Sequence, residues 1–321
     1  MGIRACMSSA FAIALVASAV TPASAADTCR LQEVTSVAMS ATADGRLLLD
    51  GAVNGEAVKL MLDTGAPRTL LEPDFVKSRN LPWKDDDRIK GYGLTGKSLS
   101  GFARINTLTL GHLQFGTQSV AFGSAGDVAG NPAGIVANDE LEAYDIEIDP
   151  AAGRLNLFSS DHCPGKVVYW ANTYSRLPLY LTTRYQPEIH VNVDGQTLLA
   201  RIDTGMANST MRLAVARRLF GVEPDAKATT QVSGVDGVKL DSFSHKFGNL
   251  TLDGVTLRNT EMQVADIDVA RDAINTGTHL QRAVDQPDMY IGMSLLSKLH
   301  MFISYSEPAV YFTLADEPKT E

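Results

Sequence analysis

A chain of 321 residues can form one large domain or two domains of ordinary size. Hydrophobic residues make up 45% of the sequence and charged residues 20%, which predicts a packed core and excludes wholesale disorder. The formal net charge is −9, and no cluster of Lys and Arg occurs. A nucleic-acid backbone is therefore not expected as a partner, because neutralising phosphates requires clustered basic residues.

The first 25 residues have the three-part pattern of a secretory signal peptide. Arg4 supplies a positive start, an apolar stretch covers 11–20, and Ala-Ser-Ala at 23–25 precedes Ala26. The apolar stretch is too short to cross a membrane, which takes about 20 apolar residues. We expect cleavage near Ala25 and export to the periplasm or beyond, with no stable membrane anchor left on the mature chain.

Removal of the signal peptide also removes Cys6 and leaves two cysteines, Cys29 and Cys163. Disulfides persist in the oxidising compartments that exported proteins enter. The even count therefore predicts a Cys29–Cys163 disulfide. Residues 26–44, which contain Cys29, are either a pro-segment or an additional strand.

An acidic residue ends the apolar run LML at 60–62 and is followed by Thr64 and Gly65. On its own, Asp63 before these residues is typical of a turn, because short polar side chains and Gly suit chain reversal. The same triplet recurs as Asp203, Thr204 and Gly205, at an offset of 140. The repeat extends upstream, where VNGEAVKLMLDTG aligns with VDGQTLLARIDTG. Each copy contains an Asn-Gly or Asp-Gly pair, which predicts a two-residue hairpin turn.

The repeat also extends downstream of both triplets. GLTGKSLSGF aligns with GVDGVKLDSF, and TLTLGHLQF aligns with NLTLDGVTL in the alternating pattern of half-buried strands. Each half then closes with two apolar residues, a small residue, a short helical patch and a strand, after an insertion within 265–288 of the second half. We predict an N-terminal domain at 26–158, a connecting segment at 159–187 with packed strands, and a C-terminal domain at 188–321. A second triplet at the matching point of a repeat favours Asp63 and Asp203 as reacting groups.

This arrangement resembles the retropepsin-like aspartic proteases, in a bacterial exported form that fuses two halves in one chain. The resemblance implies an all-β, bilobed acid-protease fold with a pseudo-twofold axis, in which Asp63 and Asp203 form the catalytic dyad. Thr64 and Thr204 would hydrogen-bond across the axis, and Gly65 and Gly205 would let the backbone approach the carboxylates. Two hairpins would be flaps over the substrate, with these residues: Tyr92, Gly93, Gly96, Gly234 and Gly237. Tyr92 is either a flap residue that touches substrate or an exposed loop aromatic.

The chemistry of such a dyad follows from placing two carboxylates face to face. Both cannot ionise cheaply, so one pKa rises and the pair holds one proton, as is general for aspartic proteases. The ionised member can deprotonate water while the protonated member donates to the scissile carbonyl. The flaps would bind an extended peptide by strand-like main-chain hydrogen bonds. One chain supplies both half-sites, so a monomer is expected, without cofactor or metal.

The residues after the triplets depart from the family pattern. Ala66 and Pro67 follow the first triplet, whereas Met206 and Ala207 follow the second. Neither Ala66 nor Met206 has a hydroxyl to donate to a carboxylate, and such a bond would lower its pKa. We therefore expect an activity optimum in the mildly acidic to neutral range. Ala137 also stands where the second half has Gly292.

Other motifs do not support a different chemistry. GYGLTG at 91–96 matches a dinucleotide fingerprint in letters but lacks the preceding buried strand and following helix. The six His residues lack metal-ligand spacing, and no G-x-S-x-G elbow occurs. The sequence favours an exported aspartic endopeptidase. A catalytically silent peptide-binding or scaffolding protein of the same fold is the alternative, and a structural envelope protein explains the paired acids least well.

Overall fold

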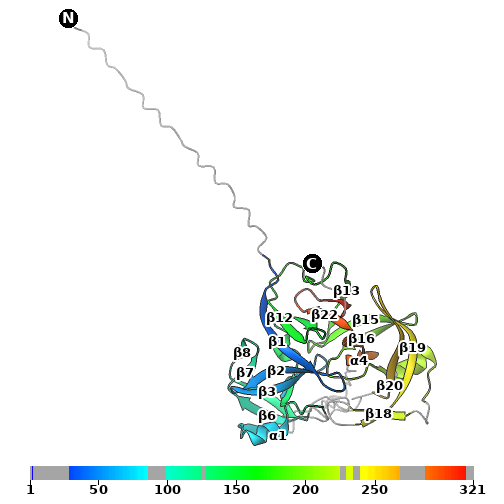
Figure 1. Ribbon diagram of the computed structural model, residues 1–321, viewed down its shortest axis with the longest axis horizontal. Helices are drawn as coiled ribbons and strands as arrows, with labels where there is room; N and C mark the ends of the chain where they lie inside the picture. The colour runs from blue at the N-terminus through cyan, green and yellow to red at the C-terminus, as the bar shows by residue number, and fades with distance from the viewer. Residues whose placement is uncertain are drawn as a thin grey trace.

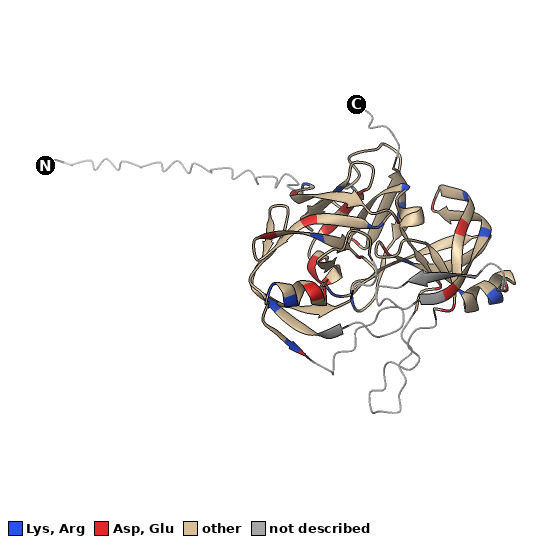
Figure 2. Ribbon diagram, turned by 60° about the horizontal axis from the view of Figure 1, so that its bottom comes forward, with Lys and Arg blue, Asp and Glu red and all other residues tan. Residues whose placement is uncertain are grey.

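The computed structural model describes Gly2 and residues 29–85, 99–124, 128–224, 229–233, 239–267 and 286–315. Residues 3–25 of the predicted signal peptide and most of the predicted insertion lie outside this part of the chain. None of the described helices is long or apolar enough to span a membrane. In the view of Figure 2, Lys and Arg residues are spread over both halves among Asp and Glu residues.

The first half consists mainly of short strands with two short helices. Its helices are α1 (Pro73–Ser78) and α2 (Asn138–Leu141). Its strands are β1 (Glu33–Ala41), β2 (Leu47–Val53), β3 (Glu56–Leu62), β4 (Leu70–Leu71), β5 (Trp83–Asp85), β6 (Leu99–Ile105), β7 (Leu108–Leu110), β8 (Leu113–Phe115), β9 (Gln118–Gly123), β10 (Gly134–Val136), β11 (Asp145–Asp149) and β12 (Arg154–Phe158).

The rest of the chain repeats this composition. Its helices are α3 (Leu213–Phe220) and α4 (Met293–Leu296). Its strands are β13 (Ser175–Pro178), β14 (Tyr180–Leu181), β15 (Pro187–Val193), β16 (Gln196–Ile202), β17 (Thr210–Arg212), β18 (Thr229–Ser233), β19 (Lys239–Leu252), β20 (Val255–Ala265), β21 (Met289–Ile291), β22 (Leu299–Ser304) and β23 (Ala309–Leu314).

The two halves have the same strand order. It is β2-β3-β10-β4-β9-β6-β5 in the first half and β15-β16-β21-β17-β20-β19-β18 in the second. In each half, the strand that ends before the Asp pairs in parallel with the strand of the closing motif, β3 with β10 and β16 with β21. The predicted all-β, bilobed fold with two equivalent halves is confirmed. Figure 1 shows the halves on opposite sides of the molecule.

Local turn chemistry sets the strand register in both halves. Asn54 and Asp194 have positive φ angles of 51° and 46°, and the Gly after each is also at positive φ. Two such residues in succession form the turn whose twist matches antiparallel strands. The predicted hairpins thus join β2 to β3 and β15 to β16, and they bring each strand to its Asp in the same register.

A shared antiparallel sheet joins the two halves. Its order is β13-β23-β22-β11-β12-β1, and β11 of the first half pairs with β22 of the second, with Ile146 opposite Ile303. Strand β1 pairs with β12 in this sheet and with β2 in the first half. Residues 33–41, within the segment for which a pro-segment was the alternative, are therefore an integral strand. The domain boundaries at 158 and 187 stay predictions.

The carboxylates of β11 are covered by residues 159–174, which we call the strap. Asp145 is 1% exposed and accepts hydrogen bonds from Ser304 Oγ at 2.7 Å and from His162 of the strap. Glu147 accepts from His300 Nε2 and from Tyr169 Oη of the strap, both at 2.7 Å. These partners come from both halves, so the buried acids tie the halves together.

The pKa of Glu147 shows that its partners outweigh its burial. Burial raises the pKa of this carboxyl, but hydrogen bonds from His300, Asn156 and Tyr169 bring it below its ordinary value. The Trp170 ring of the strap stacks on His300 at 4.0 Å between centroids. Glu147 is therefore a structural, ionised carboxylate at the junction of the halves.

The predicted disulfide is confirmed. Cys29 and Cys163 are bonded, with their Cα atoms 5.1 Å apart and 134 residues of separation in sequence. The bond ties the segment before β1 to the strap. It closes a long loop, and in the chain-entropy model such a closure restricts the unfolded state most strongly.

Replacing both cysteines by Ser should lower the free energy of unfolding by about 2–4 kcal/mol, because the loop closure is lost from the unfolded ensemble. Urea unfolding of the oxidised protein and of the double variant measures this difference. Reductant should destabilise the parent protein and leave the variant unchanged. Equal stability of oxidised and reduced parent protein would show that the bond contributes nothing.

Candidate active site

Asp63 and Asp203 begin two equivalent loops at the ends of β3 and β16. The Asp63 amide donates to Val136 O and the Asp203 amide to Ile291 O, each at 3.0 Å. Both acceptors end the strands of the closing motifs, so each acid is fixed by the neighbouring parallel strand. The side chains are buried, with Asp63 1% and Asp203 8% exposed.

The two loops are held together by a reciprocal set of hydrogen bonds through Thr64 and Thr204, which we call the threonine grip. Thr64 Oγ1 donates to Ile202 O, and Thr204 Oγ1 donates to Leu62 O, both at 2.8 Å. Each hydroxyl also accepts from the backbone amide of the other Thr, at 3.0 and 3.1 Å. Both threonines are fully buried. The grip makes the two loops one rigid unit across the pseudo-twofold axis.

The glycines of both triplets permit a close approach between the loops. A Cβ atom on Gly65 would overlap the carboxylate of Asp203, and one on Gly205 would overlap that of Asp63. Each glycine therefore lies directly against the acid of the opposite half. This reciprocal contact brings the six predicted residues of the two triplets into one site.

Backbone amides supply the hydrogen bonds to both acids. Ala66 N donates to Asp63 Oδ1 at 2.9 Å, and Gly205 N donates to Asp203 Oδ1 at 3.0 Å. The other oxygen of Asp63, Oδ2, is buried and has no donor among the described residues. As expected from the sequence, Ala66 and Met206 offer no hydroxyl here. Met206 instead packs with Ala265, Ile267 and Tyr290.

The pKa values of both acids are raised. Burial is the largest cause for Asp63, the charge of Asp203 adds to it, and together they hold its pKa well above the ordinary value. Burial also raises the pKa of Asp203, to about 6, against the lowering effects of Arg201 and the loop amides. The pair therefore retains one proton in the mildly acidic to neutral range.

The closing motifs support the two loops by different means, and the sequence did not reveal this difference. In the second half, Met293 N donates to Met206 O at 2.8 Å, because Gly292 leaves no side chain between the backbones. In the first half, Ala137 replaces this glycine, and the equivalent bond from Asn138 N to Ala66 O lengthens to 3.4 Å.

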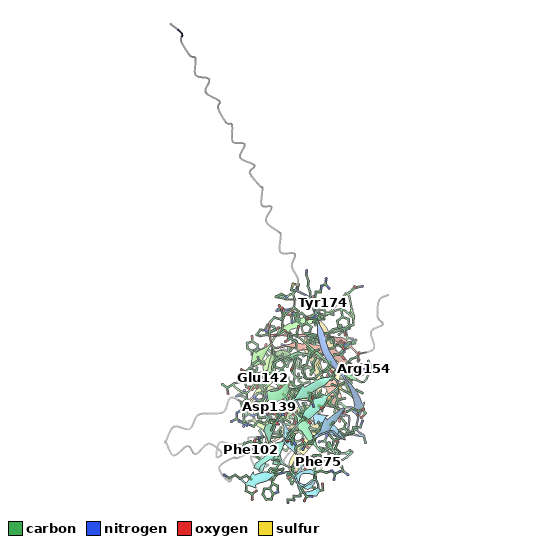
Figure 3. The ribbon with its side chains drawn as sticks, turned by 90° about the vertical axis from the view of Figure 1, so that its left-hand side faces the viewer. Phe75, Phe102, Asp139, Glu142, Arg154 and Tyr174 are labelled. Carbon is green, nitrogen blue, oxygen red and sulfur yellow. A yellow bond between two sulfur atoms is a disulfide. The ribbon has the colours of Figure 1, made fainter. Side chains whose placement is uncertain are left out.

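The side chain of Asn138 compensates for that longer bond. Its Nδ2 donates to Thr64 O and Ala66 O, each at 2.7 Å, and its Oδ1 accepts from Tyr305 Oη at 2.9 Å. The signal for this role was present in the sequence, since a polar residue follows Ala137 where the second half has apolar Met293. The neighbouring Asp139 of α2, labelled in Figure 3, accepts a hydrogen bond from Thr69 Oγ1. Thr69 is the last residue of this loop before β4.

The flap residues predicted from the sequence lie outside the described part of the chain: Tyr92, Gly93, Gly96, Gly234 and Gly237. The strands that lead into both segments are described. β5 pairs antiparallel with β6, and β18 pairs antiparallel with β19, with Ser233 opposite Lys239. Antiparallel pairs of this kind can be joined by a hairpin, so the flap assignment stays a prediction.

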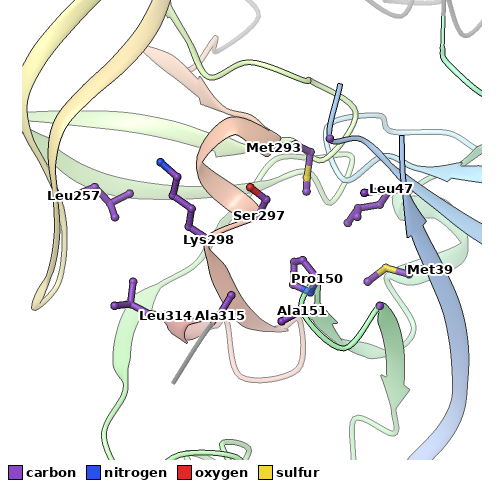
Figure 4. A pocket seen from close by; sticks show the side chains of 13 residues that line it. Met39, Leu47, Pro150, Ala151, Leu257, Met293, Ser297, Lys298, Leu314 and Ala315 are labelled. Carbon is purple, nitrogen blue, oxygen red and sulfur yellow. The ribbon is translucent and has the colours of Figure 1, made fainter. Parts of the chain in front are cut away.

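A separate cavity of about 610 Å³ lies between the halves, away from the two triplets. Figure 4 shows that apolar side chains such as Met39, Leu47 and Met293 line it, with Lys298 among them. No predicted site residue belongs to its lining. Within the described ranges, no cluster of three or more His, Cys, Asp or Glu residues could hold a metal ion.

The threonine grip should be essential for stability. Thr204→Val removes one donor and one acceptor in a buried place, so we expect a loss of about 1–3 kcal/mol for each group left unpaired. Thr204→Ser keeps the hydroxyl and should retain most of the stability. Urea unfolding of the three proteins measures the difference. Equal unfolding midpoints for the Val and Ser variants would show that the hydroxyl of Thr204 does not stabilise the protein.

Comparison with protein families agrees with this geometry. The sequence matches a family model described as aspartyl protease in two regions, residues 49–136 and 189–295. These regions contain one triplet each. Comparison with curated protein sequences gives no significant match.

Several solved structures match most of the chain at low sequence identity. An aspartic proteinase from Irpex lacteus is 12% identical, with a TM-score of 0.49, covering 88% of this chain and 97% of its own. Conglutin gamma, a basic 7S globulin from lupine seeds, is 11% identical with a TM-score of 0.47, over 88% and 95% of the two chains. Basic 7S globulin from soybean is 9% identical with a TM-score of 0.44, over 89% and 95%.

The family model covers more than half of the chain, once in each half, and both matched regions lead to equivalent Asp-Thr-Gly loops that meet at one buried site. The chain therefore belongs to the aspartyl protease family, with two fused retropepsin-like halves.

Proposed function

We propose that this protein is an exported aspartic endopeptidase that hydrolyses peptide bonds by activating water between Asp63 and Asp203. The observation that carries the proposal is the buried, reciprocally held pair of carboxyls whose pKa values are both raised. Burial of two acids costs stability, and groups with strongly raised pKa values cluster at functional sites. The disulfide supports export, because such bonds persist in oxidising compartments.

The reaction uses one proton shared by the dyad. The ionised carboxylate takes a proton from water, whose oxygen attacks the carbonyl carbon of the peptide bond, while the protonated carboxyl donates its proton to the carbonyl oxygen. Collapse of the tetrahedral intermediate breaks the C–N bond. The amine leaves with a proton from the dyad, and one hydroxyl of the intermediate returns its proton to the dyad as the carboxyl product forms. The two Asp carboxyls then again hold one proton between them.

The substrate in this proposal is an extended polypeptide. Each half offers an antiparallel strand pair, β5–β6 and β18–β19, that leads into a predicted flap. Flaps at these positions would bind the main chain by strand-like hydrogen bonds and leave side-chain pockets to set preference. Both acids come from one chain, so the proposed active species is a monomer.

A catalytically silent peptide-binding protein is the second candidate. The observation that favours it is the absence of a hydroxyl at Ala66 and Met206, so that the loops reach the acids through backbone amides alone. The intact pair of acids favours the enzyme, because peptide binding by itself gives no chemical reason to bury two carboxyls side by side.

Substitution of either acid separates the two candidates. Asp63→Asn and Asp203→Asn should each lower the cleavage rate of a diverse peptide mixture by at least about 100-fold, since each removes general acid–base catalysis. Asp50→Asn, on an exposed side chain of β2, is the matched control and should leave the rate unchanged. Activity that survives in one of the two dyad variants would contradict the two-carboxyl mechanism. Peptide binding by the parent protein without cleavage would favour the silent candidate.

The dependence of the rate on pH provides a further test. Activity should rise as the pH increases through about 6, because Asp203 then loses its proton and becomes the base. It should fall again at higher pH, when the raised pKa of Asp63 is reached and the acid is lost. The initial cleavage rate measured from pH 3 to pH 9 should therefore have a mildly acidic to neutral optimum. An optimum well below pH 4 would be inconsistent with two raised pKa values.

A further inference from the structure

The strand that leads to Asp203 contains a buried ion pair. Arg201 of β16 lies directly opposite Glu188 of β15. The guanidinium donates to Glu188 Oε1 from Nη2 at 2.6 Å and from Nε at 3.1 Å. The two side chains are only 12% and 7% exposed, respectively. A charge pair at this depth is weak evidence for stability, because desolvation offsets much of its attraction.

The equivalent positions of the first half are apolar. Leu48 lies opposite Met61 in the same register, and each is 140 residues before its counterpart. Both are buried in a cluster with Leu70, Ala121 and Ile135. The fold therefore does not require a charge pair at this place, since the first half forms the same strands with Leu and Met.

The charge of Arg201 acts on one acid of the dyad. Arg201 is on β16, two residues before Asp203, which directly follows the strand. Residues at this spacing lie on the same side of an extended chain. Its guanidinium also lies over the ring of Tyr290 on β21, 5.7 Å from the ring centre. Arg201 is the largest electrostatic influence that favours ionised Asp203.

Charged and titratable groups from several elements surround the dyad. Those near Asp203 and its neighbour Tyr290 are Asp63 after β3, Glu188 on β15, Arg201 on β16, Arg212 on β17 and Tyr290 on β21. The cation that acts on Asp63 is Arg46, whose guanidinium is bound to Asp44. Its effect on Asp63 is smaller than those of burial, Asp203 and the loop amides.

The oxygen atoms of Asp63 indicate where the proton lies. Oδ1 accepts from Ala66 N, but Oδ2 is buried without a donor among the described residues. A buried acceptor without a partner is costly. A proton on Asp63 removes this cost, because the protonated carboxyl can donate to Asp203. A hydrogen bond from Asp63 also lowers the pKa of Asp203.

We propose that the Arg201–Glu188 pair is a positioning device that keeps Asp203 as the ionised base of the dyad and leaves the shared proton on Asp63. The role of Asp203 as the catalytic base rests on the proposed peptidase function. The position of the proton on Asp63 does not depend on that function. Arg201 acts through Asp203 and is not itself a catalytic residue.

Two variants should move the dyad in opposite directions. Arg201→Met with Glu188→Leu recreates the apolar pair of the first half, and loss of the cation should shift the ionisation of Asp203 upward by about one pH unit. Glu188→Gln keeps the cation and removes the anion that neutralises it, so Asp203 should ionise at lower pH. The acidic limb of the kcat/KM profile should follow both shifts. Unchanged or parallel shifts would overturn the proposal, because a purely structural pair predicts no opposite pH effects.

A direct titration of the two carboxyls decides the proposal without any turnover. The Asp ¹³Cγ signals of the dyad can be followed by NMR in the parent protein and both variants, with Asp63→Asn and Asp203→Asn providing the assignments. In the parent protein, Asp203 should lose its proton before Asp63. The reverse order, or an order unaffected by both variants, would refute the assignment. A parent protein that cleaves no peptide would instead refute the proposed function, while the NMR titration still tests the position of the proton.

Discussion

The main physical constraint on the structure is the burial of two carboxyls at the junction of its halves. Two acids in such a place repel each other and lose hydration, which raises both pKa values and disfavours close approach. The threonine grip opposes the repulsion between the acids with four hydrogen bonds between buried groups. These bonds hold the two loops against each other, so the acids stay close enough to share a proton. The glycine contacts, the closing motifs and the register of β3 and β16 all serve to place these loops.

A second set of buried acids explains how one chain holds the two halves together. Strand β11 pairs with β22 of the other half. Its Asp145 is hydrogen-bonded to His162, and its Glu147 to His300. The strap covers this face and is joined by the disulfide to the segment before β1. These acids have ordered donors, unlike Asp63 Oδ2, and the pKa of Glu147 is lowered rather than raised. The contrast separates a structural carboxyl such as Glu147, whose donors hold it ionised, from Asp63, whose Oδ2 has no donor among the described residues.

The repeat in the sequence predicts the strand pattern, the hairpin turns and the pairing of Asp63 with Asp203, because each depends on local residues compared across an offset of 140. The joining sheet could not be predicted in this way, since the contact between β11 and β22 links segments whose pairing no local pattern encodes. The only sequence signal for the role of Asn138 was a polar residue aligned with apolar Met293. This role arises only because Ala137 lengthens a backbone bond by its side chain, and an amide at the next residue restores the support. Arg201 and Glu188 did carry a signal, because these charged residues align with apolar Met61 and Leu48 of the first half.

Fusion of two halves permits an asymmetry that an exact twofold dimer does not have. Where both loops are identical, the shared proton has equal access to either acid, and the substrate alone breaks the symmetry. In this chain Leu48 and Met61 of one half correspond to Glu188 and Arg201 of the other, so the two acids lie in different electrostatic fields before any substrate binds. An ion pair buried beside Asp203 makes its ionised form the easier one to reach, whereas Asp63 lies next to an apolar cluster that favours its neutral form. In the proposed peptidase, this asymmetry would assign the roles of base and acid before substrate binds, and a peptide would need to enter in only one orientation.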